Sequence, residues 1–263
     1  ARVTKVESGW GNIITPQQIA EALRTVSKPK LIAIVHAETS TGVLSDAKTL
    51  VDIAHKHNAL TIVDCVTSLG GCEVRVDDWK LDAVYSASQK CLSCTPGLSP
   101  VSISERVVDF VKGRKDKIHS WFMDMNLLLG YWGETNRTYH HTAPTNSLFA
   151  LHESLVLIQE EGLENTWLRH LTMHKLLKAG LEDLNLEFFV DEKSRLPQMN
   201  AIICPKGINE LSVRKRLLNE YGIEIGAGLG PLSGKIWRIG IMGYSARPEN
   251  IVKCLNALEE VLK

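Results

Sequence analysis

Three charged side chains stand where the surrounding sequence predicts buried strands or the ends of buried strands. Asp64 directly follows the strand-like run Leu60–Val63, and Lys90 comes a few small polar residues after a second apolar run. Arg238 is the single charge inside the apolar segment Ile236–Ile241. A charge at such a position is costly to desolvate, so each of the three calls for a partner or a chemical task.

Asp64 and Lys90 together are typical of a pyridoxal phosphate site. The carboxyl ends of neighbouring strands meet at one edge of an open α/β sheet, which is where ligands bind. A lysine amine there can form an imine with an aldehyde, and a carboxylate can keep the ring nitrogen protonated so that the ring accepts electrons. A helix cap or turn explains Asp64 alone, and a surface loop explains Lys90 alone. Only the pairing favours the cofactor.

Arg238 is suited to binding a substrate carboxylate through two parallel hydrogen bonds. A structural salt bridge with an Asp or Glu explains the same residue equally well, because a buried Arg needs an anionic partner of some kind.

Other patterns carry less chemistry. The six cysteines suggest buried thiols in a reducing compartment, and Cys91–Cys94 lacks the second pair that a zinc site needs. His140 and His141 lack a third ligand, so no metal is expected. The segment Gly226–Pro231 fits neither a dinucleotide fingerprint nor a phosphate loop, and predicts a turn that shapes a pocket.

The elements that must position these residues alternate between strand and helix. Thr15 to Gln18 is a capping box that begins a helix, and Ser45 to His57 predicts another helix that stops at Asn58. The runs 31–35, 60–63 and 83–85 predict strands, the first of them buried on both faces. This order predicts a parallel sheet with crossover helices.

A change in pattern follows Ser147. One helix is expected to end near Gly162, and a second runs toward Gly180. Strands at 187–190, 201–204 and 236–241 follow, with helices at 211–221 and after Pro248. We therefore expect an α/β large domain over residues 1–161 and a smaller α+β domain over 162–263.

Composition excludes several classes of protein. The chain of 263 residues has 30 Lys+Arg and 30 Asp+Glu, so the formal net charge is zero and a nucleic-acid partner is not expected. Neither a membrane span nor a secretory signal is predicted, which favours an intracellular protein. The chain does not begin with Met, and we expect it to be the C-terminal part of a longer polypeptide.

Several motifs in fixed order resemble one family of enzymes. They are His36–Leu44, Val63-Asp64 followed by Ser68–Gly71, Ser86–Lys90, Tyr139–Thr142, Gly162–Asn165, Ile225–Gly230 and Trp237–Gly240. Together these are similar to the alanine–glyoxylate (serine–pyruvate) aminotransferases, which are class V, fold-type I pyridoxal phosphate enzymes. The resemblance covers essentially the whole chain.

The resemblance implies a role for each matching position. Lys90 would form the Schiff base and shuttle the proton, Asp64 would pair with the pyridinium nitrogen, and Arg238 would clamp the substrate α-carboxylate. Further cofactor contacts would come from Thr39 at the ring oxygen, Gln89 at the phosphate, and Tyr139 and Thr142 at the phosphate of a neighbouring subunit.

The implied reaction transfers an amino group from alanine or serine to glyoxylate, and the transfer from alanine gives pyruvate and glycine. Small amino acids and 2-oxo acids would be the substrates of a homodimer with shared active sites. The family's compartment is a peroxisome or mitochondrion, and the cytosol is also compatible. The alternatives are a 3-hydroxykynurenine transaminase, a cysteine desulfurase-like enzyme, which would need a mobile nucleophilic cysteine, and a non-catalytic fragment that only dimerises.

One departure from the family concerns the start of the chain. Family members carry a preceding segment with a phosphate-binding loop and an aromatic residue that stacks on the cofactor. From this resemblance we expect residues 1–263 alone to bind pyridoxal phosphate weakly.

Overall fold

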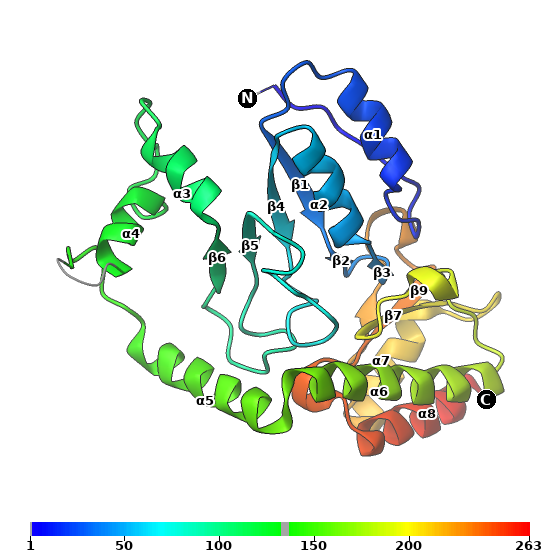
Figure 1. Ribbon diagram of the computed structural model, residues 1–263. Coiled ribbons are helices and arrows are strands. Elements are labelled where there is room, and N and C mark those ends of the chain that lie inside the picture. The colour runs from blue at the N-terminus through cyan, green and yellow to red at the C-terminus, as the bar shows by residue number, and fades with distance from the viewer. Residues whose placement is uncertain (1, 133–136) are drawn as a thin grey trace.

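Two separate sheets organise the computed structural model, which describes residues 2–132 and 137–263 (Figure 1). The first sheet has the order β1-β4-β5-β6. Strands β1 (Leu31–Val35), β4 (Leu60–Asp64) and β5 (Ala83–Tyr85) are parallel, and β6 (Val101–Ile103) is antiparallel to β5. The predicted strands are therefore confirmed, and the carboxyl ends of three of them meet at one edge.

Helix α2 (Ala47–Lys56) packs on β1 and β4, and α1 (Pro16–Arg24) packs on α2. The predicted capping box of α1 is present, because the Thr15 hydroxyl accepts the Gln18 N–H at 3.2 Å and the Gln18 side-chain oxygen accepts the Thr15 N–H at 2.8 Å. The apolar face of α2 is buried against the sheet. The first core contains Leu50, Val51 and Ala54 of this helix together with Val63 and Val84.

The prediction that residues 31–35 are buried on both faces is wrong for this structure. Strand β1 lies at the edge of the sheet, where Leu31 is 57% exposed and Val35 is 45% exposed. The apolar run predicted a strand correctly. It did not show whether both faces of that strand are covered, because an edge strand can have the same run of residues.

A short hairpin follows β1 at the carboxyl edge. It consists of β2 (Ala37–Glu38) and β3 (Val43–Leu44), with Gly42 at φ +81° completing the turn. The Gly42 carbonyl accepts the Leu196 N–H at 2.8 Å. The hairpin therefore ties the first sheet to the second half of the chain.

The second sheet has the order β7-β9-β8 and is antiparallel throughout. Its strands are β7 (Met199–Ile203), β8 (Gly226–Ala227) and β9 (Ile236–Gly240). Helices α6 (Leu163–Asp183), α7 (Glu210–Tyr221) and α8 (Pro248–Leu262) pack together beside it around a second core. The strand predicted at 187–190 is wrong: the segment forms a single bridge between Phe188 and Ile202, because its backbone pairs with β7 at one point only.

A long helical stretch connects the two halves. Helix α5 (Thr145–Glu161) and α6 run end to end, with a break at Gly162, where φ is +88° (Figure 1). The predicted domain boundary at residues 161 and 162 coincides with this break and stays a prediction. Two helices that the sequence analysis did not predict, α3 (Glu105–Lys112) and α4 (Met125–Trp132), lie outside the first sheet and bury no residue. No helix within the described ranges is long and apolar enough to cross a membrane.

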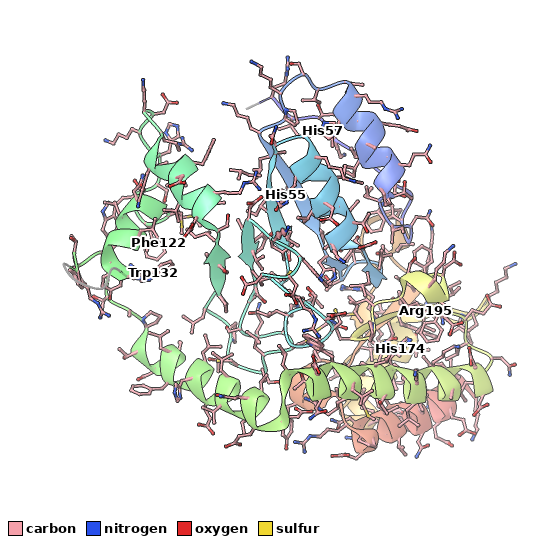
Figure 2. All side chains as sticks on the ribbon, in the orientation of Figure 1. His55, His57, Phe122, Trp132, His174 and Arg195 are labelled. Atoms are coloured by element: carbon pink, nitrogen blue, oxygen red, sulfur yellow. The ribbon has the colours of Figure 1, made fainter. Side chains whose placement is uncertain are left out.

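The amino ends of the strands carry a buried polar network around Asp82, which is 1% exposed. Its carboxylate accepts the Thr61 N–H at 2.9 Å and lies 2.8 Å from His55 Nε2 and 3.0 Å from Arg106 Nη1. Burial alone would raise the pKa of Asp82, but these partners outweigh it and lower that pKa. Figure 2 shows His55 and His57 at the end of α2 farthest from the second sheet. The network therefore stabilises the sheet at the edge opposite to the carboxyl ends of its parallel strands.

Candidate active site

Asp64 lies at the carboxyl end of β4, where the sequence placed it. One carboxylate oxygen accepts the Val66 N–H at 2.9 Å and the other accepts the Tyr85 hydroxyl at 2.7 Å. Both donors are neutral, and neither oxygen is saturated by one hydrogen bond. Each carboxylate oxygen therefore retains a lone pair for a further donor at the sheet edge.

Tyr85 was not predicted as part of the site. It stands opposite Asp64 in the parallel pairing of β4 and β5, so strand register is the signal that could have found it. Its hydrogen bond to Asp64, helped by burial, raises the pKa of Tyr85 to about 12. The phenol therefore stays a donor to the carboxylate over the whole physiological range.

Lys90 follows β5 and is half-buried in a cavity of about 470 Å³. Gln89 lines the same cavity, together with residues of the second sheet and of the segment after it, among them Met199, Met242 and Tyr244. Across the described parts of the chain, the Lys90 amine forms no ion pair with a carboxylate. The amine is therefore available for a ligand.

The loops that follow β4 and β5 lie against each other. The Cys91 thiol donates to the Thr67 carbonyl at 3.3 Å, and the Ser86 hydroxyl donates to the Cys65 carbonyl at 3.0 Å. These contacts bring the segment after Asp64 next to the segment that carries Lys90.

Arg238 and Thr39 are also brought together. Arg238 Nε donates to the Ala227 carbonyl at 2.7 Å, and Nη1 donates to the Thr39 carbonyl at 3.0 Å. Gly226 lies beside the guanidinium, since a β-carbon there would be 3.4 Å from Arg238 Nη2, an ordinary van der Waals contact. In the described residues no carboxylate pairs with Arg238, which disfavours a structural salt bridge. Two carbonyls orient the cation, and Nη2 is left for an anion.

Tyr139 and Thr142 lie elsewhere. Their hydroxyls are 2.6 Å apart, and Tyr139 is 70% exposed. They belong to the segment between α4 and α5, and neither of them lines the Lys90 cavity. The structure therefore groups Lys90 with Gln89 and Arg238 with Thr39, and it separates Tyr139 and Thr142 from both pairs.

The residues present fit pyridoxal phosphate by the chemistry of their donors. The two donors to the Asp64 carboxyl group are neutral, which leaves it suited to a protonated ring nitrogen. Lys90 is an amine without a carboxylate partner in the described ranges, facing a cavity. The Asp64 carboxyl group and the Lys90 amine follow adjacent strands and do not pair with each other. A cofactor ring could therefore bind between them.

The remaining candidates add no second site. All six cysteines are free, and burial raises the pKa of Cys72 and of Cys91 to about 12, so neither is a ready nucleophile. The ring nitrogens of His140 and His141 lie 2.8 Å apart. Within the described residues, no group of three or more possible metal ligands is clustered.

Comparison with known proteins points to one family. A family model described as aminotransferase class V matches residues 1–244. The (S)-ureidoglycine–glyoxylate transaminase of Bacillus subtilis (strain 168) is 41% identical, over 100% of this chain and 67% of the relative. Alanine–glyoxylate aminotransferase of Oryctolagus cuniculus is 38% identical, over 100% of this chain and 68% of the relative.

Solved structures agree with this assignment. Alanine–glyoxylate aminotransferase from Nostoc sp. superimposes with a TM-score of 0.94 and 43% identity, over 97% of this chain and 67% of that one. Pyridoxamine–pyruvate aminotransferase from Mesorhizobium loti gives a TM-score of 0.90 and 27% identity, over 96% of this chain and 64% of that one. The chain spans about two thirds of the length of these relatives.

Proposed function

Because the chain belongs to the class V aminotransferase family, we propose that it is a pyridoxal phosphate-dependent transaminase that moves an amino group from alanine to glyoxylate. The products are pyruvate and glycine, and serine is a further donor. The observation that carries the proposal is the half-buried Lys90 amine, which lines a cavity after β5 and has no carboxylate partner in the described ranges, together with Asp64 at the end of the neighbouring strand β4.

Lys90 and Asp64 divide the chemistry. When bound, pyridoxal phosphate supplies an electron-withdrawing ring that accepts the charge left when the substrate loses its α-proton. The Lys90 amine holds the cofactor, is released by the incoming amino acid, and takes the proton from the substrate α-carbon as a general base. The Asp64 carboxylate accepts a hydrogen bond from the ring nitrogen, and Tyr85 holds that carboxylate in place.

Arg238 orients both substrates. Alanine and glyoxylate share a carboxylate, and the unbonded Nη2 of Arg238 can donate to it. The bond from Nη1 to Thr39 links this clamp to the hairpin at the carboxyl edge of the first sheet. The Thr39 hydroxyl would contact the ring oxygen of the cofactor, and Gln89 would help to hold its phosphate.

Tyr139 and Thr142 act on a second copy of the chain in this proposal. Both residues are exposed and neither lines the Lys90 cavity of its own chain, which supports a contact with the phosphate bound by a neighbouring subunit. The active enzyme would then be a homodimer in which each site uses both subunits.

A second candidate donor is (S)-ureidoglycine. It is supported by the Bacillus subtilis relative named for that reaction, which is 41% identical, and by the matching crystal structure with a TM-score of 0.93. Both candidates use glyoxylate as the acceptor. Steady-state kcat/KM for alanine, serine, ureidoglycine and 3-hydroxykynurenine, each with glyoxylate, decides between them.

Lys90→Ala tests the proposal directly. The holoenzyme is treated with borohydride, digested, and searched by mass spectrometry for a reduced pyridoxyl group. We expect that group on Lys90 in the unchanged protein, and neither label nor transamination in Lys90→Ala. Lys112→Ala, which alters an exposed lysine on α3, is the matched control and should retain both. Labelling at any other lysine, with activity intact in Lys90→Ala, would rule out the assignment.

A further inference from the structure

One short turn, Gly243–Ser245, is held from two sides. It follows β9, the strand that carries Arg238, and it lines the Lys90 cavity through Tyr244. The Ser93 hydroxyl accepts the Tyr244 N–H at 2.7 Å, and the Ser93 N–H in turn donates to the Lys90 carbonyl at 3.0 Å. Ser93 therefore joins the turn to the loop that presents the reactive amine.

The other side of the turn is anchored on α6. The Gly243 N–H donates to His170 Nε2 at 2.8 Å, and His170 is fully buried. Since Nε2 accepts, the ring hydrogen is on Nδ1, which donates to the Thr166 carbonyl at 2.6 Å. Arg169 Nη1 donates to the Gly243 carbonyl at 2.7 Å. The N–H and the carbonyl of Gly243 are therefore both held by side chains of α6.

Ser93 leaves no room for a side chain at Gly243. A β-carbon on Gly243, where φ is +55°, would lie 1.8 Å from the Ser93 hydroxyl oxygen. Ser93 itself has φ +59°, a conformation that costs a residue with a side chain and suits glycine. A strained residue persists where its side chain has a task, and here the hydroxyl is the acceptor for the turn.

We propose that Ser93 is a positioning residue, whose hydrogen bond to the Gly243–Ser245 turn sets the distance between the Lys90 amine and the Arg238 clamp. The inference rests on the proposed function. A substrate held by its carboxylate at Arg238 must offer its α-carbon to Lys90, and these two groups come from different sheets. A small error in their separation misaligns the proton transfer while leaving cofactor attachment to Lys90 unchanged.

Ser93→Gly separates this role from a purely structural one. The change removes the acceptor and at the same time suits the backbone at φ +59°, so we expect the thermal midpoint to stay within about 3 °C. In the holoenzyme, kcat/KM for the amino donor should fall about ten- to a hundredfold. Borohydride labelling of Lys90 should be unaffected.

Asn58→Gly is the matched control. Asn58 has nearly the same backbone conformation, φ +55°, but lies beyond the end of α2 at the opposite edge of the sheet. Its kcat/KM should equal that of the unchanged enzyme.

A double-mutant cycle tests the contact itself. Gly243→Ala pushes the new β-carbon into the Ser93 hydroxyl and should impair kcat/KM. Adding Ser93→Gly removes that obstruction, so the double variant should be less impaired than the product of the two single effects. Additive effects, or an unchanged kcat/KM in Ser93→Gly, would overturn the proposal. In either of those outcomes, borohydride labelling of Lys90 would still support the proposed function. If Lys90 in the unchanged enzyme were not labelled, the proposed function itself would be ruled out.

Discussion

The Asp64 carboxylate is partly buried yet has neutral partners, the Val66 N–H and the Tyr85 hydroxyl. Its position at a strand end could be predicted, because a carboxylate after an apolar run marks the edge where parallel strands stop. Its partners could not, since they depend on the register between β4 and β5. The roles of Asp64, Lys90 and Arg238 remain predictions from their chemistry and from the family resemblance. Those of Thr39, Gln89, Tyr139 and Thr142 remain predictions from the resemblance alone.

Tyr85→Phe tests the importance of the hydroxyl at this carboxylate. A hydrogen bond to a charged group is worth about 1.5–3 kcal/mol, so we expect kcat to fall tenfold or more. Steady-state kinetics measures the loss, and thermal unfolding checks that the fold is retained. Tyr221→Phe, on the last turn of α7, is the control and should keep full activity. Equal kinetics for the two variants would show that the phenol does not support Asp64.

Most helices and strands could be predicted from local patterns, because caps and apolar periodicity are written into neighbouring residues. The stop of α2 before Asn58 and the start of α1 at its capping box are examples. Strand β6 was not predicted, since none of its three side chains is buried and it lacks the apolar run that indicated β5. Nor was α3, although Ser104 caps it as serine caps many helices.

Gly42 makes the link between the hairpin and the second sheet depend on one small residue. Its φ is +81°, and a β-carbon would lie 2.7 Å from the Met199 carbonyl oxygen. Gly42→Ala should therefore destabilise the protein through both strain and the clash, by about 2–4 kcal/mol. Urea unfolding provides the free energy of unfolding.

Gly207→Ala is the control for this element. Gly207 has φ +85°, but no atom lies within 4 Å of the position that a β-carbon would take. This variant should lose only the strain, about 1–2 kcal/mol. If the two alanine variants unfold at the same urea concentration, the contact with Met199 contributes nothing.

At the scale of the whole molecule, the fold class expected from the sequence is confirmed by solved relatives with TM-scores of 0.90 and above. Alternation of strands and helices sufficed for the parallel sheet. The join between the halves could not be predicted, because His170, Gly243 and Ser93 are far apart in the sequence and meet only through packing.

Buried histidines make the stability of the whole molecule depend on pH. His36 is 4% exposed, and burial lowers its pKa from 6.5 to about 4. The unfolded chain therefore takes up a proton below pH 6.5 that the folded chain refuses, so stability falls as the pH drops from 6.5 to about 4. Between pH 7 and pH 5 this one residue should cost about 2 kcal/mol.

His36→Asn should flatten that dependence, as measured by urea unfolding at pH 7 and pH 5. His152→Asn, an exposed substitution on α5, should leave the slope unchanged. An unaltered slope in His36→Asn would mean that other groups, such as His170 and His174, whose pKa values burial also lowers, account for the effect.

The bond from Arg238 to Thr39 spans 199 positions of the chain. Contacts of such sequence separation form late in folding, because the chain loses the entropy of closing a long loop before the contact contributes favourable free energy. The hairpin and the clamp thus acquire their working geometry only once both sheets have folded and docked. A partial opening that parts the two sheets breaks this hydrogen bond while most helices and strands are still intact, and with it the substrate recognition that we propose for Arg238.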